Sequence, residues 1–317
     1  ADDLFDSINI AHDTRWDLPV PPVAEVKGYM RQVLEKEIEM LQQENNSEED
    51  LYLYRYALFH EDMHTEAFTY TRQTLDYPVP SLHPPTQLPE PAGMIEGDAQ
   101  VPACDYLLGA RPEDGFCFDN EKLAHEVRVE AFEIARAPVT NQQFLELVDA
   151  GGYENRDYWD EAGWNWRKQR RHSHQVYWRK EDRQWQRKLF DQWQALPPDQ
   201  PVIHVSWHEA QAWCNWAGRR LPTEAEWELA ASGPDKLTYP WGEDLPTESH
   251  VNMDSRTLGC IDVGALPAGD SIYGCRQMMG NVWEWTSTLF SPYPGFTPDM
   301  YDEYSCLLYT SDAADDN

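Results

Sequence analysis

The sequence predicts an α+β protein in which a helical N-terminal segment is followed by a larger, irregular domain. Two stretches with helical apolar periodicity come first, and a proline-rich stretch separates them from a region rich in tryptophan, glycine and short apolar alternations. The chain has 317 residues and 14 tryptophans, enough for about two domains with sizeable cores. We therefore expect a helical domain over residues 1–77, a linker over 78–92 and a second domain over 93–305.

The first predicted helix covers residues 23–43. Its apolar residues recur at steps of three and four, at Val23, Val26, Met30, Leu34, Ile38 and Leu41. This spacing is typical of a helix with one apolar face. We expect that face to lie against the next helix, so that the two form half of a four-helix bundle.

The second predicted helix begins at Ser47, which forms a capping box with Asp50, and ends at about residue 76, before a Tyr-Pro pair. It carries His60 and His64, which are four residues apart and therefore project from one face, where they can bind one metal ion. Bundles build metal sites from facing helices, so a third ligand is expected in a segment that precedes residue 1.

Three interpretations of the two histidines are open. In the first, the imidazoles only pack and hydrogen-bond inside a bundle. In the second, the segment 60–64 (HEDMH) is the H-E-x-x-H signature of a zinc protease, but no histidine follows at the positions of the extended motif, where Ala67 and Tyr70 stand nearby. In the third, the pair belongs to a non-haem iron site with open positions for oxygen and substrate.

Charge and cysteine content narrow the class of protein. The chain has 56 acidic and 25 basic residues and a net charge of −31, which repels nucleic acids and anionic membranes, so neither is expected as a partner. No apolar run is long enough to span a membrane. The cysteines at 104, 117, 214, 260 and 275 are scattered and form no C-x-x-C pair. They predict free thiols in a reducing, cytoplasmic compartment.

The linker and the second domain have weaker local signals. Five prolines between residues 77 and 91 favour an extended, semi-rigid chain. The alternation at 126–130 predicts a strand, and helices are expected only near 141–150 and 207–216. Residues 306–317 resemble the translation of a sequencing adapter, so we expect the natural sequence to depart from this chain after Ser305.

Four blocks of the second domain carry a family resemblance. They are APVTNQQF at 137–144, PVIHVSW at 201–207, GRRLPTEAEWE at 218–228 and MGNVWEWT at 279–286. These blocks resemble the formylglycine-generating, sulfatase-modifying-factor type of domain, which implies an irregular variant of the C-type lectin-like fold. Glu224, Glu226 and the tryptophans are then expected to stabilise the fold. By the same analogy, Asn281 and Glu284 are expected to hold a structural calcium ion.

A DinB-like helical bundle followed by such a domain resembles the iron-dependent sulfoxide synthases of ergothioneine biosynthesis. The resemblance implies that His60 and His64 bind Fe(II) together with a third histidine from an earlier helix. The R-x-x-L-P segment of that family matches residues 15–19, which implies that Arg15 binds a carboxylate of the thiol substrate.

Two tyrosines and one departure complete the resemblance. The family's tyrosine pair, which follows a P-G-F turn, matches Tyr301 and Tyr304 after residues 294–296. It implies that Tyr301 is a catalytic acid and that Tyr304 contacts substrate. Met63 stands where many of these enzymes have a glutamine that contacts the histidine-derived substrate. The segments 12–19 and 60–64 look closest to the branch that makes selenoneine.

The expected function is therefore oxygen-dependent formation of a C–S or C–Se bond on the imidazole ring of histidine betaine. The expected small-molecule partners are histidine betaine, dioxygen and either a thiol or a selenosugar donor. Two alternatives are a formylglycine-generating type of oxidase, which acts on a protein cysteine, and a non-catalytic, lectin-like binding module. The module would bind no metal at the histidine pair.

Overall fold

The computed structural model describes residues 10, 14, 17–43, 47–81, 89–254, 256–300 and 305. The chain divides into two compact units. The first unit comprises residues 1–69 and 298–311, and the second comprises residues 70–297 and 312–317. The division falls inside a helix, earlier in the chain than the predicted boundary at residue 77.

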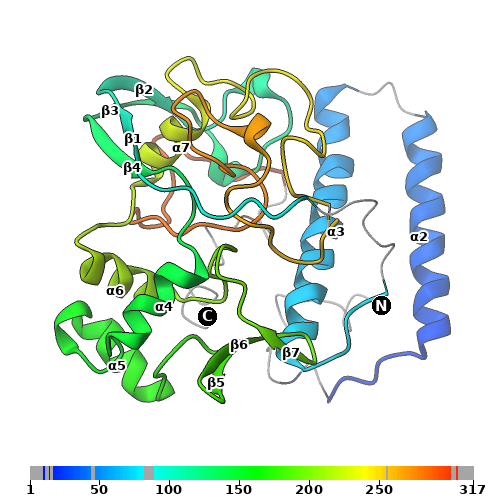
Figure 1. Cartoon of the computed structure of the whole chain (residues 1–317). Helices are drawn as coiled ribbons and strands as arrows, with labels where there is room; N and C mark the ends of the chain where they lie inside the picture. Colours follow the sequence, from blue (N-terminus) through cyan, green and yellow to red (C-terminus); the bar gives the residue numbers. More distant parts are fainter. Residues whose placement is uncertain are drawn as a thin grey trace. The chain divides into compact units, whose positions relative to one another are not determined.

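The described part of the first unit contains two long helices, α2 (Val23–Gln43) and most of α3 (Glu48–Thr74) (Figure 1). Both confirm the helices predicted from apolar periodicity and from the capping signal. The apolar face of α2 is not buried, because Val23, Met30 and Leu34 are 71%, 56% and 55% exposed. The expectation that this face packs on the next helix is therefore wrong for the described residues. Two helices enclose little interior, whereas the four of a complete bundle surround a core.

The last turn of α3 belongs to the second unit. The side-chain amide of Gln73 is buried and bridges two backbone groups of one strand end: it donates to the carbonyl of Lys188 at 3.3 Å and accepts from the N–H of Phe190 at 2.6 Å. The hydroxyls of Thr74 and Tyr177 lie 3.3 Å apart. These bonds tie the end of the helix to the strand, so the turn is part of the second unit rather than of the helical first unit.

In the described part of the second unit, seven short strands form three antiparallel sheets. They are β1 (Asp98–Val101) with β4 (Phe132–Ala135), β2 (Cys104–Leu108) with β3 (His125–Val129), and β5 (Trp178–Glu181) with β6 (Gln184–Leu189) and β7 (Gln192–Ala195). In the three-stranded sheet, Arg187 on β6 lies opposite Trp178 on β5 and Gln194 on β7. β3 confirms the strand predicted from the alternation at 126–130.

The helices of the second unit are α4 (Asn141–Asp149), α5 (Glu161–Arg170), α6 (Trp207–Ala217) and α7 (Glu224–Ser232), with short 3-10 helices at Pro112–Asp114, Asp119–Glu121, Arg156–Tyr158 and Pro267–Gly269. α4 and α6 confirm two predictions. α5 and α7 were not expected, and α7 is begun by a capping box between Thr223 and Glu226. That pattern is visible in the sequence, but the low apolar periodicity of so short a helix hides it.

Two apolar clusters form the interior of the second unit. One joins β2 and β3 to α7 through residues such as Tyr106, Val129 and Leu229. The other joins α4, α6 and β5 through Phe144 and Trp178, whose rings meet edge to face. The five described cysteines are free thiols, as predicted.

Acidic side chains tie this irregular structure together. The carboxylate of Glu226 accepts two hydrogen bonds from the Arg220 guanidinium, at 2.6 and 2.7 Å, while it also caps α7. Glu224 accepts a bond of 2.7 Å from the hydroxyl of Tyr293. Both glutamates thus have the stabilising role that was expected of them. None of the helices in the described part of the chain is both long and apolar enough to span a bilayer.

Candidate functional site

One face of α3 carries a ladder of aromatic rings that includes both predicted metal ligands. Tyr52, Tyr56, His60, His64 and Phe68 follow one another at steps of four residues, and neighbouring ring centroids lie 6.0, 6.2, 4.5 and 6.4 Å apart along the series. A step of four returns a side chain to the same face of a helix. The sequence spacing therefore places the two imidazoles next to each other without help from tertiary structure.

The His60 and His64 rings are nearly parallel, with an angle of 27° between their planes. His60 is half-buried and His64 is exposed. Burial lowers the pKa of His60, the nearby His64 lowers it further, and Glu61 acts in the opposite direction. His60 is therefore neutral at pH 7, the form whose ring nitrogen has a lone pair for a metal ion.

The donor chemistry of this pair fits an iron ion in part. Two imidazoles on one helical face are ligands that suit Fe(II), and they leave most of the coordination sphere open. Among the residues that the structure describes, no group of three or more His, Cys, Asp or Glu side chains could hold a metal ion. The third histidine expected before residue 1 stays a prediction.

The described part of the chain near Tyr301 reaches α3 within the first unit. The hydroxyl of Tyr52 donates a hydrogen bond of 2.7 Å to the carboxylate of Asp299. Tyr52 lies two helical turns before His60 on the same face, and Asp299 lies two residues before Tyr301. This bond brings the segment before the predicted catalytic acid to the helix that bears the histidines.

The other predicted site residues have separate places. Met63 lies on α3 between the two histidines and is 42% exposed. Arg15, Tyr301 and Tyr304 lie outside the described residues, so their predicted roles stay predictions. Asn281 and Glu284 lie in an extended loop of the second unit.

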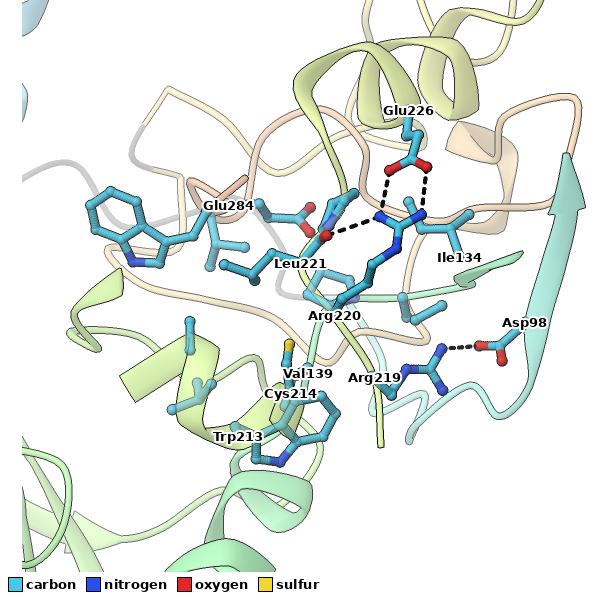
Figure 2. A pocket seen from close by; sticks show the side chains of 18 of the residues that line it. Asp98, Ile134, Val139, Trp213, Cys214, Arg219, Arg220, Leu221, Glu226 and Glu284 are labelled. Carbon is cyan, nitrogen blue, oxygen red and sulfur yellow. Dashed lines mark hydrogen bonds and ion pairs between the residues drawn. The ribbon is translucent and has the colours of Figure 1, made fainter. Parts of the chain in front are cut away.

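A pocket of about 390 Å³ in the second unit lies beside that loop (Figure 2). Its walls come from β4, α6 and the segments 218–222 and 282–285, and most of them are apolar, with Ile134, Val139 and Leu221 among them. Two ion pairs border it: Arg220 with Glu226, and Arg219 with Asp98. The positive charges in this wall are therefore already neutralised.

Two carboxyl groups of this pocket, Glu133 and Glu284, have no ion pair among the described residues, and Glu133 accepts a hydrogen bond from the Gln100 amide. The pKa of Glu284 is shifted. Solvent reaches the Glu284 side chain through the pocket. Loss of hydration beside the surrounding protein nevertheless raises its pKa to about 7, and an interaction with the Trp227 indole lowers the pKa in part. A carboxyl group in this state is half-protonated near neutral pH, so it can donate or accept a hydrogen bond.

The Asn281 side chain is fully hydrogen-bonded to residues of its own and of earlier loops. Its amide oxygen accepts from the side chain of Asn252 at 2.9 Å and from the N–H of Ile261 at 3.0 Å, and its amide nitrogen donates to Gln277 and to the carbonyl of Ile261. Both lone pairs of the amide oxygen are engaged in this arrangement. The calcium site at Asn281 and Glu284 stays a prediction.

The sequence did not indicate a site at Arg187 and His204, two residues of the second unit that interact electrostatically. Burial lowers the pKa of His204 to about 4, and the positive charge of Arg187 lowers it as well. Arg187 lies outside the four family blocks, and His204 lies within the block 201–207 but at a position to which no role was assigned. Their proximity depends on the pairing of strands and on a loop that follows β7, which no short-range pattern indicates.

Comparison with known proteins agrees with the blocks found in the second unit. The family model of the sulfatase-modifying factor enzyme 1-like domain matches residues 85–310. The hercynine oxygenase of Mycobacterium tuberculosis is 35% identical to this chain over 98% of the chain and 73% of the relative. The hercynine oxygenase of Mycolicibacterium smegmatis is 34% identical over 100% of the chain and 74% of the relative.

Two further matches cover less of the chain. The formylglycine-generating enzyme of Thermomonospora curvata is 33% identical over 63% of this chain and 74% of that enzyme. The structure of PvdO from Pseudomonas aeruginosa is 20% identical, with a TM-score of 0.39 over 59% of this chain and 69% of that one. The family match and the near full-length relatives lead to one conclusion: the chain belongs to the family of sulfatase-modifying factor enzyme 1-like proteins, and it is similar to hercynine oxygenases from its helical segment onward.

Proposed function

We propose that this protein is an iron- and oxygen-dependent enzyme that joins a sulfur or selenium atom to the imidazole ring of hercynine, the betaine of histidine. One observation carries the proposal: a pair of stacked imidazoles on one face of α3, in a chain that is 35% identical over 98% of its length to a hercynine oxygenase. The name of the relative suggests the substrate class and the use of oxygen. The histidine pair suggests the metal.

The helix would hold the metal through His60 and His64. When bound, iron supplies open positions at which dioxygen and a soft thiolate or selenolate can bind side by side. His60 contributes because its lowered pKa keeps the imidazole neutral. Met63 would contact the hercynine ring with its thioether, where a glutamine would offer a hydrogen bond.

The remaining roles belong to residues that bind substrate or move a proton. The Tyr301 hydroxyl would donate its proton during oxygen reduction. The bond between Tyr52 and Asp299 supports this role, because it holds the segment two residues earlier against α3. Arg15 would hold a carboxylate of the donor with its planar fork, and Tyr304 would contact substrate.

The overall reaction with a thiol donor balances without a further co-substrate. The ring loses a C–H bond, the donor loses its S–H bond, and a C–S bond forms. One oxygen atom of O2 ends in a sulfoxide and the other ends in water, so the four electrons that O2 accepts come from the ring carbon and the sulfur.

The test is oxygen consumption by the full-length protein after reconstitution with Fe(II). Hercynine is offered with a cysteine-type thiol or with a selenosugar, and the product is identified by mass. We expect a product with one donor and its loss in His64→Ala, because that variant removes an imidazole ligand. Asp62→Ala, an exposed neighbour on the same helix, is the matched control and should retain the activity.

Two other results would point elsewhere. A protein that binds iron but forms no product with either donor contradicts the proposal. A protein that binds no iron indicates the lectin-like binding module instead.

A formylglycine-generating type of oxidation is the second candidate, since the chain is 33% identical to such an enzyme over 63% of its length. That activity would convert the cysteine of a peptide to an aldehyde, and it would survive His64→Ala because the histidine pair lies outside the matched domain. Incubation of both proteins with a cysteine-containing peptide, followed by an aldehyde-specific label, separates the two functions.

A further inference from the structure

Arg187 lies on β6, the middle strand of the three-stranded sheet, and shares a row with Trp178 and Gln194 on the neighbouring strands (Figure 1). Opposed residues of antiparallel strands point to the same face of the sheet. Trp178 is 4% exposed and belongs to the apolar interior, so this row faces inward. The sheet therefore directs a guanidinium group toward the inside of the second unit.

One edge of the guanidinium is held by a neutral amide. In the amide orientation that satisfies both side chains, the oxygen of Gln194 accepts from Arg187 Nε at 3.0 Å and from Nη2 at 3.2 Å. Nη1 donates to no described residue, but it is not sealed from solvent. The amide thus fixes the plane of the guanidinium and leaves its outer edge open.

The charge of Arg187 is not neutralised by any described residue. No carboxylate in the described ranges lies within ion-pair distance of it, although acidic residues outnumber basic ones by 56 to 25 in the whole chain. A shortage of acids is therefore not the reason. A partly buried charge without a partner is costly, so such charges in proteins are often paired or bind a ligand.

The two titratable neighbours that interact with Arg187 are uncharged at pH 7. Burial lowers the pKa of His204 to about 4, so the imidazole is neutral and does not repel an anion. Burial raises the pKa of Cys260 to about 11, with Arg187 acting in the opposite direction, so the thiol does not supply a negative charge. The site as a whole has a single positive charge.

The loop that carries His204 is held rigidly. The Gln175 amide nitrogen donates to the carbonyls of Ile203 and His204, at 2.8 and 3.2 Å, and the Tyr177 ring meets the His204 ring edge to face at 4.9 Å. Residues 187, 204 and 260 are far apart in the sequence but close enough in the fold to interact electrostatically, and the Gln194 amide orients the guanidinium.

From this arrangement we infer that Arg187 binds the carboxylate group of a small molecule, which no known site of the chain accounts for. A carboxylate matches the site because its two oxygens fit the planar fork and because one negative charge balances one guanidinium. A phosphate is a poorer match, since its second charge would find no other cation among the described neighbours. The carboxylate can belong to hercynine or to another carboxylic acid.

The direct test follows the Arg187 side-chain Nε–H by ¹⁵N nuclear magnetic resonance in the full-length protein. The resonance is assigned by its loss in Arg187→Lys. We expect it to shift saturably as sodium acetate is added. Arg187→Met should lose the acetate-dependent rise in melting temperature that wild type shows, while Arg183→Gln, an exposed arginine on the same hairpin, should keep it.

The melting curves also separate binding from a structural role. If Arg187 is reserved for a ligand, Arg187→Met should melt at or above the wild-type temperature in carboxylate-free buffer, because it removes an unpaired interior charge. Arg187→Lys keeps the charge and loses the fork, so its affinity for acetate should be at least tenfold weaker. A wild-type resonance that responds to neither acetate nor hercynine overturns the inference. It is also overturned if Arg187→Met melts far below wild type and the melting temperature of neither protein responds to acetate.

The source of the carboxylate is decided by two further ligands. The hercynine titration rests on the proposed function, whereas the acetate titration does not. Hercynine and its methyl ester differ in the charge of one group, so a shift with hercynine and none with the ester assigns the site to substrate. A shift with acetate alone assigns it to a free carboxylic acid. Neither titration needs catalytic turnover, so the binding result can be interpreted even if the proposed reaction does not occur.

Discussion

Tyr153→Phe should destabilise the second unit through a single lost hydrogen bond. Tyr153 is fully buried, and its hydroxyl donates to Glu209 Oε1 at 2.5 Å. Glu209 is 3% exposed, and its other oxygen accepts from the backbone N–H and the hydroxyl of Ser206, at 2.8 and 3.1 Å, as part of the cap of α6. Removal of the hydroxyl leaves Oε1 buried without its donor.

The expected cost follows from the burial of both partners. A buried acceptor that loses its donor costs about 1–3 kcal/mol, because it cannot return to water. For a unit of this size, each kcal/mol lowers the melting temperature by about 2–4 °C, so the variant should melt about 2–12 °C below wild type. Chemical denaturation of both proteins at pH 7 measures the free-energy difference directly.

The same bond predicts how the cost depends on pH. Burial raises the pKa of Glu209, and the bonds from Tyr153 and Ser206 act in the opposite direction. A raised pKa means that the folded carboxyl is stabilised below the unfolded value of about 4.3 and loses that stability as the pH rises through the folded pKa. The Tyr153→Phe deficit should therefore grow as the pH rises through the folded pKa of Glu209, since the charged form needs the donor most.

The matched control is Tyr70→Phe, which removes the same atom from a side chain that is 56% exposed. It should change the free energy of unfolding by no more than about 0.5 kcal/mol. A Tyr153→Phe variant that is equally neutral at pH 7 would refute the reasoning, because it would show that the buried bond contributes no net stability.

Three further predictions concern the same unit. Burial raises the pKa of Glu226, but the bonds from Arg220 outweigh burial and leave the pKa lowered. The stability that this carboxylate contributes is therefore present above the unfolded pKa of about 4.3 and is lost as the pH falls through the folded pKa. Urea denaturation of Glu226→Gln and wild type should accordingly give converging stabilities in acid. Thr140→Val removes the cap of α4 and should cost about 0.5–2 kcal/mol by chemical denaturation. Cys214 and Cys275 are buried with pKa values raised to about 11, so Ellman's reagent should modify them only when the protein unfolds.

The helices of the first unit could be predicted from sequence because their signals are local. Apolar residues at steps of three and four mark α2, and a capping signal followed by a Tyr-Pro stop marks α3. The proximity of His60 and His64 follows from the same periodicity, since residues four apart on a helix are neighbours in any fold. The burial of α2 could not be predicted, because it depends on which surfaces surround the helix.

The second unit was predicted in part. The sequence blocks indicated its family, and local patterns indicated the strand at 126–130 and the helices α4 and α6. The helices α5 and α7 were missed because each is short and weakly amphipathic. The anchoring of Gln73 to β6 was also missed. A buried amide that bridges two backbone groups has no signature in the sequence, because its partners lie more than 100 residues away.

By itself, the sequence determined the features that depend on neighbours along the chain: the two long helices, the paired imidazoles, the capping boxes and the blocks that identify the family. Tertiary structure alone decided the features that depend on long-range contacts: the pocket beside Glu284, the near-neutral pKa of that carboxyl, and the interior cation at Arg187. The physical reason is the same for all three. Burial and electric fields are set by every atom within several ångströms, whereas periodicity and capping need only the next few residues.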